Sequence, residues 1–195
     1  FDDTSAVQII NNPLGGGGFA AAAVFAGDVN NDGIGDVAIN APFAAEGGSN
    51  AGSAFLFYGD ADLSTVQPIS ITGTTNDRFG RDISTGRDIN GDGIDDLLVS
   101  AQRASYTDGN GQTITFAGAG YVFYGPLTQD MSSADADQVI YGSEEQSQIG
   151  YNINTTEDYD GDGYANDCDP DDDNDGIADS ADIDPLDRFI CLDTD

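Results

Sequence analysis

The chain has 195 residues and a formal net charge of −31, with 36 acidic residues, five arginines as its basic residues and no histidine. This acidity leaves no basic patch for nucleic-acid phosphates, and no apolar stretch is long enough for direct membrane insertion, so we expect neither partner. Without histidine or lysine the usual general bases and Schiff-base nucleophiles are missing, and we expect no enzyme. An acid hydrolase with paired carboxylates is the remaining catalytic alternative. The hydrophobic content of 38% predicts a folded core.

Short apolar runs bounded by Gly, Asn and Asp predict an all-β fold. The same order of strands and loops occurs twice and begins a third time, in units expected at 4–63, 64–134 and 135–157. Four short antiparallel strands per unit are typical of a propeller blade. We therefore expect two to three blade-like units within 1–157, followed by a loop-rich calcium-binding segment at 158–195.

Four Asp-rich loops carry the metal chemistry. Each places side-chain oxygens at positions 1, 3 and 5, a glycine at position 6 and a backbone carbonyl at position 7, the arrangement of a loop folded around Ca²⁺. Loops three and four add a carboxylate at position 12, and Asp184 and Asp187 are possible extra ligands. The expected ligands for about four calcium ions are Asp28, Asn30, Asp32 and Ile34; Asp88, Asn90, Asp92 and Ile94; Asp158, Asp160, Asp162, Tyr164 and Asp169; and Asp171, Asp173, Asp175, Ile177 and Asp182.

Several motifs fall in one order twice: Phe79-Gly80, Asp-x-Asn-x-Asp-Gly-x-x-Asp, Ala41-Pro42 and the Gly-x-x-Tyr-x-Phe-Tyr-Gly strand ending at Gly125. This set resembles the FG-GAP repeats of integrin α-subunit propellers over about residues 4–164. The resemblance implies a β-sheet blade with a calcium site in a hairpin loop. It also implies Asp36 and Asp96 as ligands at position 9 of the first two loops. At position 9 of loops three and four we expect Asn166 and Asp179 as ligands. The sequence departs from the pattern at Ala20, Gln102 and Ile149.

From Asp158 onward the chain resembles thrombospondin type 3 repeats, which are calcium-loop arrays with little core of their own. Fifteen of the 32 aspartates lie in 158–195. Cys168 and Cys191, the two cysteines, suggest one disulfide and an oxidising compartment; two free thiols are the alternative. We therefore expect an extracellular or cell-surface location.

Two blade-like units leave sheet faces and edges exposed, which favours pairing with other chains. We therefore expect a non-catalytic, calcium-stabilised structural protein that assembles with copies of itself into a filament or surface layer. The alternative is a fragment of a cell-surface adhesion protein that binds an extracellular protein or glycan. Its ligand would contact loops such as 46–50 and 106–112, whose composition is equally that of ordinary turns.

Overall fold

The computed structural model describes residues 19, 22–59 and 67–153 of the chain. The chain divides into two units, residues 1–154 and 155–195, and the second unit lies wholly outside the described residues.

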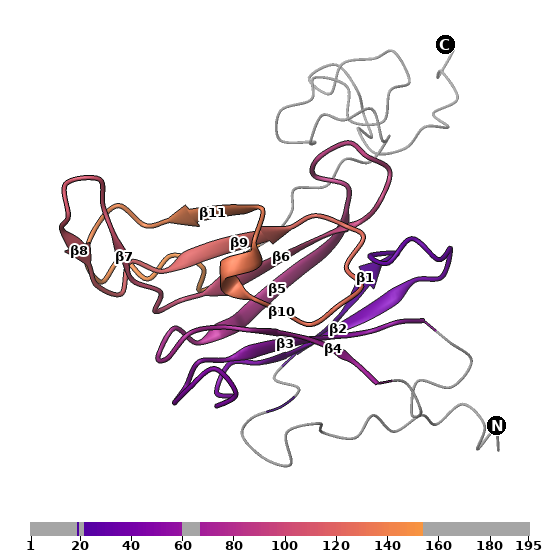
Figure 1. The fold of residues 1–195 in the computed structure, drawn as a ribbon, viewed down its shortest axis with the longest axis horizontal. Helices are drawn as coiled ribbons and strands as arrows, with labels where there is room; N and C mark the ends of the chain where they lie inside the picture. Colours follow the sequence, from indigo (N-terminus) through magenta and orange to yellow (C-terminus); the bar gives the residue numbers. More distant parts are fainter. Residues whose placement is uncertain (1–18, 20–21, 60–66, 154–195) are drawn as a thin grey trace, which may run out of the picture. The chain divides into compact units, whose positions relative to one another are not determined.

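Two β-sheets form most of the described part of the first unit (Figure 1). The first sheet has the strand order β1-β2-β3-β4-β10, in which only the β10–β4 pairing is parallel. Its strands are β1 Ala23–Gly27, β2 Asp36–Ala41, β3 Ser53–Phe57, β4 Ile69–Thr72 and β10 Met131–Ser132. The second sheet has the order β11-β9-β6-β5, with β5 Phe79–Arg87, β6 Asp96–Ala101, β9 Ala119–Phe123 and β11 Gln138–Tyr141.

The remaining elements are a small hairpin, β7 Tyr106–Thr107 with β8 Thr113–Ile114, and a 3-10 turn at Ser133–Asp135. That turn is the one helical element among the described residues. The expected fold class, antiparallel propeller-blade-like β units, is confirmed for this part of the chain.

The sheets and the sequence repeats are out of phase. In the first sheet β4, which lies between β3 and β10, comes from the start of the second repeat, and β11 of the second sheet comes from the start of the third. The third repeat also begins as the second does. Phe79 bridges Gly52 and donates its N–H to the Ala51 carbonyl at 2.9 Å, and Ile149 bridges Gly118 and donates to Ala117 at 3.0 Å. Ile149 therefore takes the place of Phe79.

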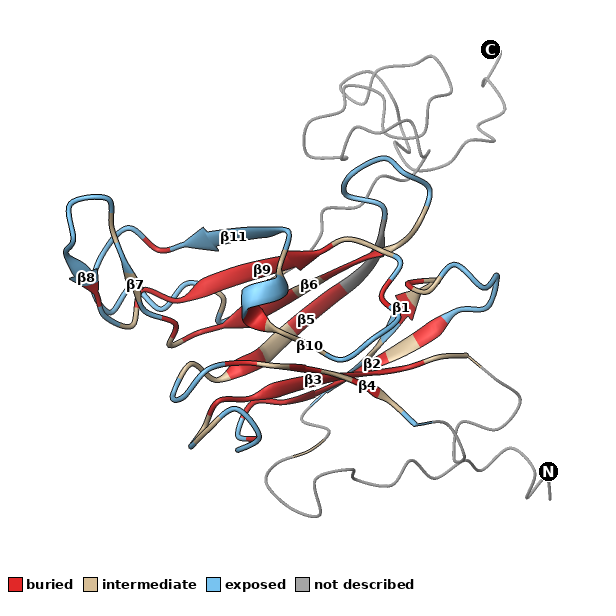
Figure 2. Ribbon diagram, viewed as in Figure 1, coloured by how far each residue is buried: buried red, intermediate tan, exposed pale blue. Residues whose placement is uncertain are grey.

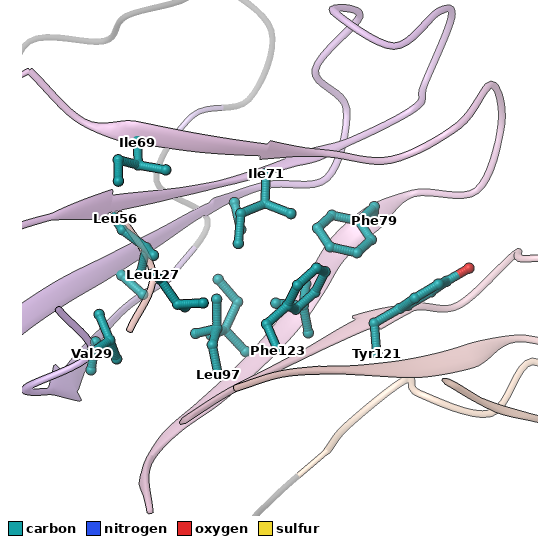
Figure 3. Close-up of a cluster of buried hydrophobic side chains, with 14 of the residues drawn as sticks. Val29, Leu56, Ile69, Ile71, Phe79, Leu97, Tyr121, Phe123 and Leu127 are labelled. Carbon is teal, nitrogen blue, oxygen red and sulfur yellow. The ribbon is translucent and has the colours of Figure 1, made fainter. Parts of the chain in front are cut away.

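The main core lies between the two sheets (Figures 2 and 3). Strand alternation directs Leu56 of β3 and Leu97 of β6 into one buried cluster. Phe79 is fully buried in this cluster, with its ring 5.4 Å from that of Tyr121 and 6.2 Å from that of Phe123 between centroids. Each such side chain contributes about 1.5–3 kcal/mol by leaving water.

A second, smaller cluster covers the other face of the first sheet. Phe55 and Phe57 of β3 lie in it, and the ring of Phe19 packs on Phe55 at a centroid distance of 5.7 Å. The aromatic residues Phe55 and Phe57 therefore pack within the fold.

The outer strand of the second sheet, β11, is exposed along its whole length (Figure 2). Ile140 is 60% exposed and Val139 37%. No described helix has the length and apolar character needed to cross a bilayer.

Candidate metal-binding loops

The first Asp-rich loop connects β1 to β2 and folds around its own amides. Asp28 accepts the N–H of Asp32 at 2.9 Å and that of Gly33 at 2.8 Å. Asn30 Oδ1 accepts the same Asp32 N–H at 2.9 Å, and Asp32 Oδ1 accepts the N–H of Ile34 at 2.8 Å. The three side chains expected as ligands therefore converge on one tight turn.

The second loop connects β5 to β6 with nearly the same bonds. Asp88 accepts the N–H of Asp92 at 2.9 Å and that of Gly93 at 2.6 Å. Asn90 Oδ1 accepts from Asp92 at 2.9 Å, and Asp92 Oδ1 accepts from Ile94 at 2.9 Å. Desolvation raises the pKa of Asp88, but the amides that it accepts outweigh this and lower it overall. The repeated sequence thus produces the same local structure twice.

Left-handed backbone closes both turns. Gly33 and Gly93 have φ angles of +87° and +89°, a region open to glycine and costly for most other residues. The second residue before each glycine, Asn31 or Gly91, is also left-handed, at +62° and +79°. Asparagine and glycine are the residue types that tolerate this conformation.

Asp36, at position 9 of the first loop, is a buried clamp. Its carboxylate accepts the N–H of Val29 at 3.0 Å and that of Gly59, just after β3, at 2.8 Å. Burial raises the pKa of Asp36, while the two amides partly offset that rise. The side chain joins the start of the loop to the end of another strand.

Asp96 does the same in the second sheet. It accepts N–H groups from Ile89 at 2.7 Å and from Gly125, just after β9, at 2.9 Å. Burial again raises the pKa of the carboxyl, partly offset by the amides. The resemblance to FG-GAP repeats gave these two residues as metal ligands; their role as buried clamps was not expected from the sequence.

The donor set fits a hard cation. Each loop offers two carboxylates, one amide oxygen and one backbone carbonyl, and the bonds above leave lone pairs free on these oxygens. Asp36 and Asp96 retain acceptor capacity too, because a carboxylate has about four lone-pair sites. Within the described residues, however, no three acidic side chains are gathered closely enough to hold a metal ion by themselves.

The surroundings of the two loops differ. The N–H of Asp28 donates to Asp95 of the second loop at 2.7 Å, and the Val29 carbonyl accepts the N–H of Leu127 at 2.7 Å. Val29 is completely buried, whereas Ile89 at the same position of the second loop is 44% exposed. Sequence reasoning missed Asp95 and Leu127, because the motif leaves position 8 unspecified and both contacts join different repeats.

Other expected site residues lie outside the described residues: loops three and four with all their ligands, from Asp158 to Asp187, and the cysteines Cys168 and Cys191. Two other loops, 46–50 and 106–112, were expected to contact an extracellular protein or glycan. In loop 106–112, the Asp108 carboxylate accepts the N–H of Asn110 at 2.9 Å and that of Gln112 at 2.8 Å. In 46–50, Glu46 accepts the Ser53 hydroxyl at 3.1 Å. The contacts of Asp108 are those of an ordinary turn, whereas the bond of Glu46 links its loop to the start of β3.

Comparison with known proteins identifies the repeats. Residues 19–57 and 79–123 match the FG-GAP repeat. The matched segments run from β1 to the end of β3 and from β5 to the end of β9, so each contains one Asp-rich loop with the strands on both sides of it. These two segments therefore match the FG-GAP repeat, in agreement with the motifs.

The curated relatives with similar sequence include integrin α subunits. Mouse integrin alpha-M is 41% identical over 92 residues, which cover 44% of this chain and 8% of that protein. Drosophila melanogaster integrin alpha-PS5 is 32% identical over 106 residues, or 50% of this chain and 10% of that protein. Mouse phosphatidylinositol-glycan-specific phospholipase D is 31% identical over 144 residues, or 70% and 16%.

The chain thus spans less than a fifth of the length of these relatives. Integrin α subunits are cell-surface proteins, which agrees with the extracellular or cell-surface location expected from the sequence.

Proposed function

We propose that this chain is a non-catalytic, calcium-stabilised module of a cell-surface adhesion protein. The observation that carries the proposal is the repeated loop, in which three oxygen-bearing side chains converge on one turn in both repeats. Its supports are the FG-GAP match and the similarity to integrin α subunits. The similarity to a phospholipase D covers 16% of that enzyme and assigns no catalytic residue to this chain.

The chain's own residues supply the calcium chemistry. Asp28, Asn30, Asp32 and the Ile34 carbonyl would hold one ion, together with the clamp residue Asp36, and the second loop would act likewise. Unbound, the loop carboxylates repel one another, so an ion that neutralises them fixes the two strands that each loop connects. A bound calcium ion would supply the positive charge, and the oxygens of these residues would coordinate it. Residues 158–195 would add two further ions as a thrombospondin type 3-like array.

The test is a calcium titration of the whole metal-free chain by calorimetry. Asp92→Asn should remove one site from the stoichiometry, because it removes a loop carboxylate. Glu145→Gln is the matched control, since it removes the same charge from an exposed residue outside the loops. Equal stoichiometry in Asp92→Asn, Glu145→Gln and the unsubstituted chain would refute the second-loop site.

A second candidate function is assembly with copies of this chain into a filament or surface layer. The exposed outer strand β11, with Val139 and Ile140 open to solvent, favours it, because an unpaired apolar edge pairs readily with another chain. Light scattering with and without calcium separates the two candidates. A monomer at high concentration with calcium present argues for the adhesion module, and calcium-dependent growth argues for assembly.

A further inference from the structure

The start of the first loop is held from outside its own repeat. The backbone N–H of Asp28, the first expected ligand, donates to the Asp95 carboxylate at 2.7 Å. The next residue, Val29, accepts an N–H from Leu127 at 2.7 Å. Both partners belong to the second repeat, so the geometry of the first loop depends on that repeat being in place.

Gly27 makes room for this contact. A Cβ added to Gly27 would lie 2.1 Å from Asp95 Oδ2, far inside van der Waals contact, and its φ of +70° independently favours glycine. The Asp95 side chain therefore lies directly against the backbone that leads into the first loop. The repeat equivalent of Asp95, Gly35, has no side chain to make such a contact.

Position 8 is glycine in the first loop (Gly35), aspartate in the second (Asp95) and alanine in the third and fourth (Ala165 and Ala178). Only the second loop has a hydrogen-bond acceptor there, so the contact to a preceding loop is possible at one junction alone. The burial of position 2 in the two described loops agrees with this difference. Val29 of the first loop is fully buried, whereas Ile89 of the second loop is 44% exposed.

Asp95 also stands between two expected ligands of its own loop, the Ile94 carbonyl and Asp96. An ion that fixes this segment fixes Asp95 with it. Asp95 then holds the Asp28 amide, and its charge adds to the negative potential at the first loop.

We infer that Asp95 is a positioning residue that couples the two loops, so that filling the second loop raises the calcium affinity of the first. This inference rests on the proposed calcium binding. Coupling between binding sites is reciprocal, so filling the first loop must raise the affinity of the second by the same factor. A factor of about fivefold, the lower end of ordinary coupling, is expected for one hydrogen bond and one charge.

A double-mutant cycle tests the coupling on the full chain. Amide signals of Gly33 and Gly93 report the occupancy of the first and second loops during a calcium titration by NMR. Asp92→Asn should lower the affinity of the first loop about fivefold, and Asp32→Asn should lower that of the second by the same factor. In an Asp95→Ala background both effects should vanish, whereas in a Glu145→Gln background both should persist. Effects that persist in Asp95→Ala overturn the inference.

Hydrogen exchange in chelator provides a readout that needs no calcium binding. The Asp28 amide should exchange about tenfold faster in Asp95→Ala, as expected when about 1.4 kcal/mol of local protection is lost. Asp95→Asn keeps a carbonyl acceptor and should retain the protection, which also provides a variant that folds if Asp95→Ala does not. Unchanged exchange in Asp95→Ala, or protection lost equally in Asp95→Asn, overturns the role of Asp95. Absence of calcium binding would instead refute the proposed function and leave this result standing.

Discussion

The two Asp-rich loops of this chain have the same internal hydrogen bonds and different surroundings. In the first loop Val29 is fully buried under the second repeat, and Asp95 holds the loop's first amide. In the second loop the equivalent residue, Ile89, is 44% exposed. One motif can therefore have two stabilities, because the motif sets the turn while the neighbouring repeat sets its burial.

Removal of calcium should have the largest effect. A site filled at 100 times its dissociation constant adds about 2.7 kcal/mol, so the two described loops together should lose about 5 kcal/mol in chelator. Scanning calorimetry should show a lower Tm. Hydrogen exchange should show the second loop opening more than the first, because only the first is held by Asp95 and Leu127. A metal-free chain with the Tm of the loaded one would contradict the calcium hypothesis.

Loss of a clamp carboxylate should come next. Asp36→Ala leaves the buried amides of Val29 and Gly59 without an acceptor and should cost about 3 kcal/mol. Asp96→Ala should cost about 2 kcal/mol, since water can reach the more exposed Ile89 amide region. Urea unfolding in chelator measures both without a contribution from bound metal. Equal losses of unfolding free energy in Asp36→Ala and Asp96→Ala would show that the greater burial of the first loop does not strengthen the contribution of Asp36.

Substitution of the apolar residue at position 2 compares the burial of the two loops more directly. Val29→Ala removes buried methyl groups and should cost about 2 kcal/mol in the free energy of unfolding. Ile89→Ala removes exposed ones and should change stability by less than about 0.5 kcal/mol. Urea unfolding of the two variants under one set of conditions checks the difference. A large cost at Ile89 would show that something covers the second loop as well.

The smallest expected effect is a pH dependence of stability that comes from Asp77, two residues before Phe79. Burial raises the pKa of Asp77, although the Thr74 hydroxyl that donates to it acts against the rise. The folded chain thus binds this proton more tightly than the unfolded chain does. The contribution of Asp77 is then fully present below its ordinary pKa and is lost as the pH rises through the raised one.

Asp77→Asn cannot titrate, so its stability relative to the unsubstituted chain should increase from about pH 4 to pH 7. Urea unfolding in chelator across that range measures the change. The next junction has Ser147 in this place, where its hydroxyl donates to the Ala117 carbonyl at 2.8 Å, and Ser147→Ala should show no such pH dependence. A constant difference between Asp77→Asn and the unsubstituted chain would show that Asp77 pays no desolvation cost.

The sequence by itself determined the elements whose contacts are local. Asp, Asn and Gly at fixed spacing produce the loop turns, because each side chain accepts amides two to five residues away. Apolar alternation between Gly-rich turns determined the strands of both sheets, and the motif order determined the match to FG-GAP repeats.

Only the tertiary structure decided that each sheet includes a strand of the following repeat, since β4 and β11 each pair with a strand of the preceding repeat. It also decided that Asp36 accepts the amide of Gly59, 23 residues away, and that Asp95 reaches Asp28 across 67 residues. Position 8 of the motif has no local partner, so the sequence near Asp95 does not predict its hydrogen bond with the Asp28 amide. Burial differs between equivalent residues for the same reason: it depends on which repeat packs beside them, and that contact is made far along the chain.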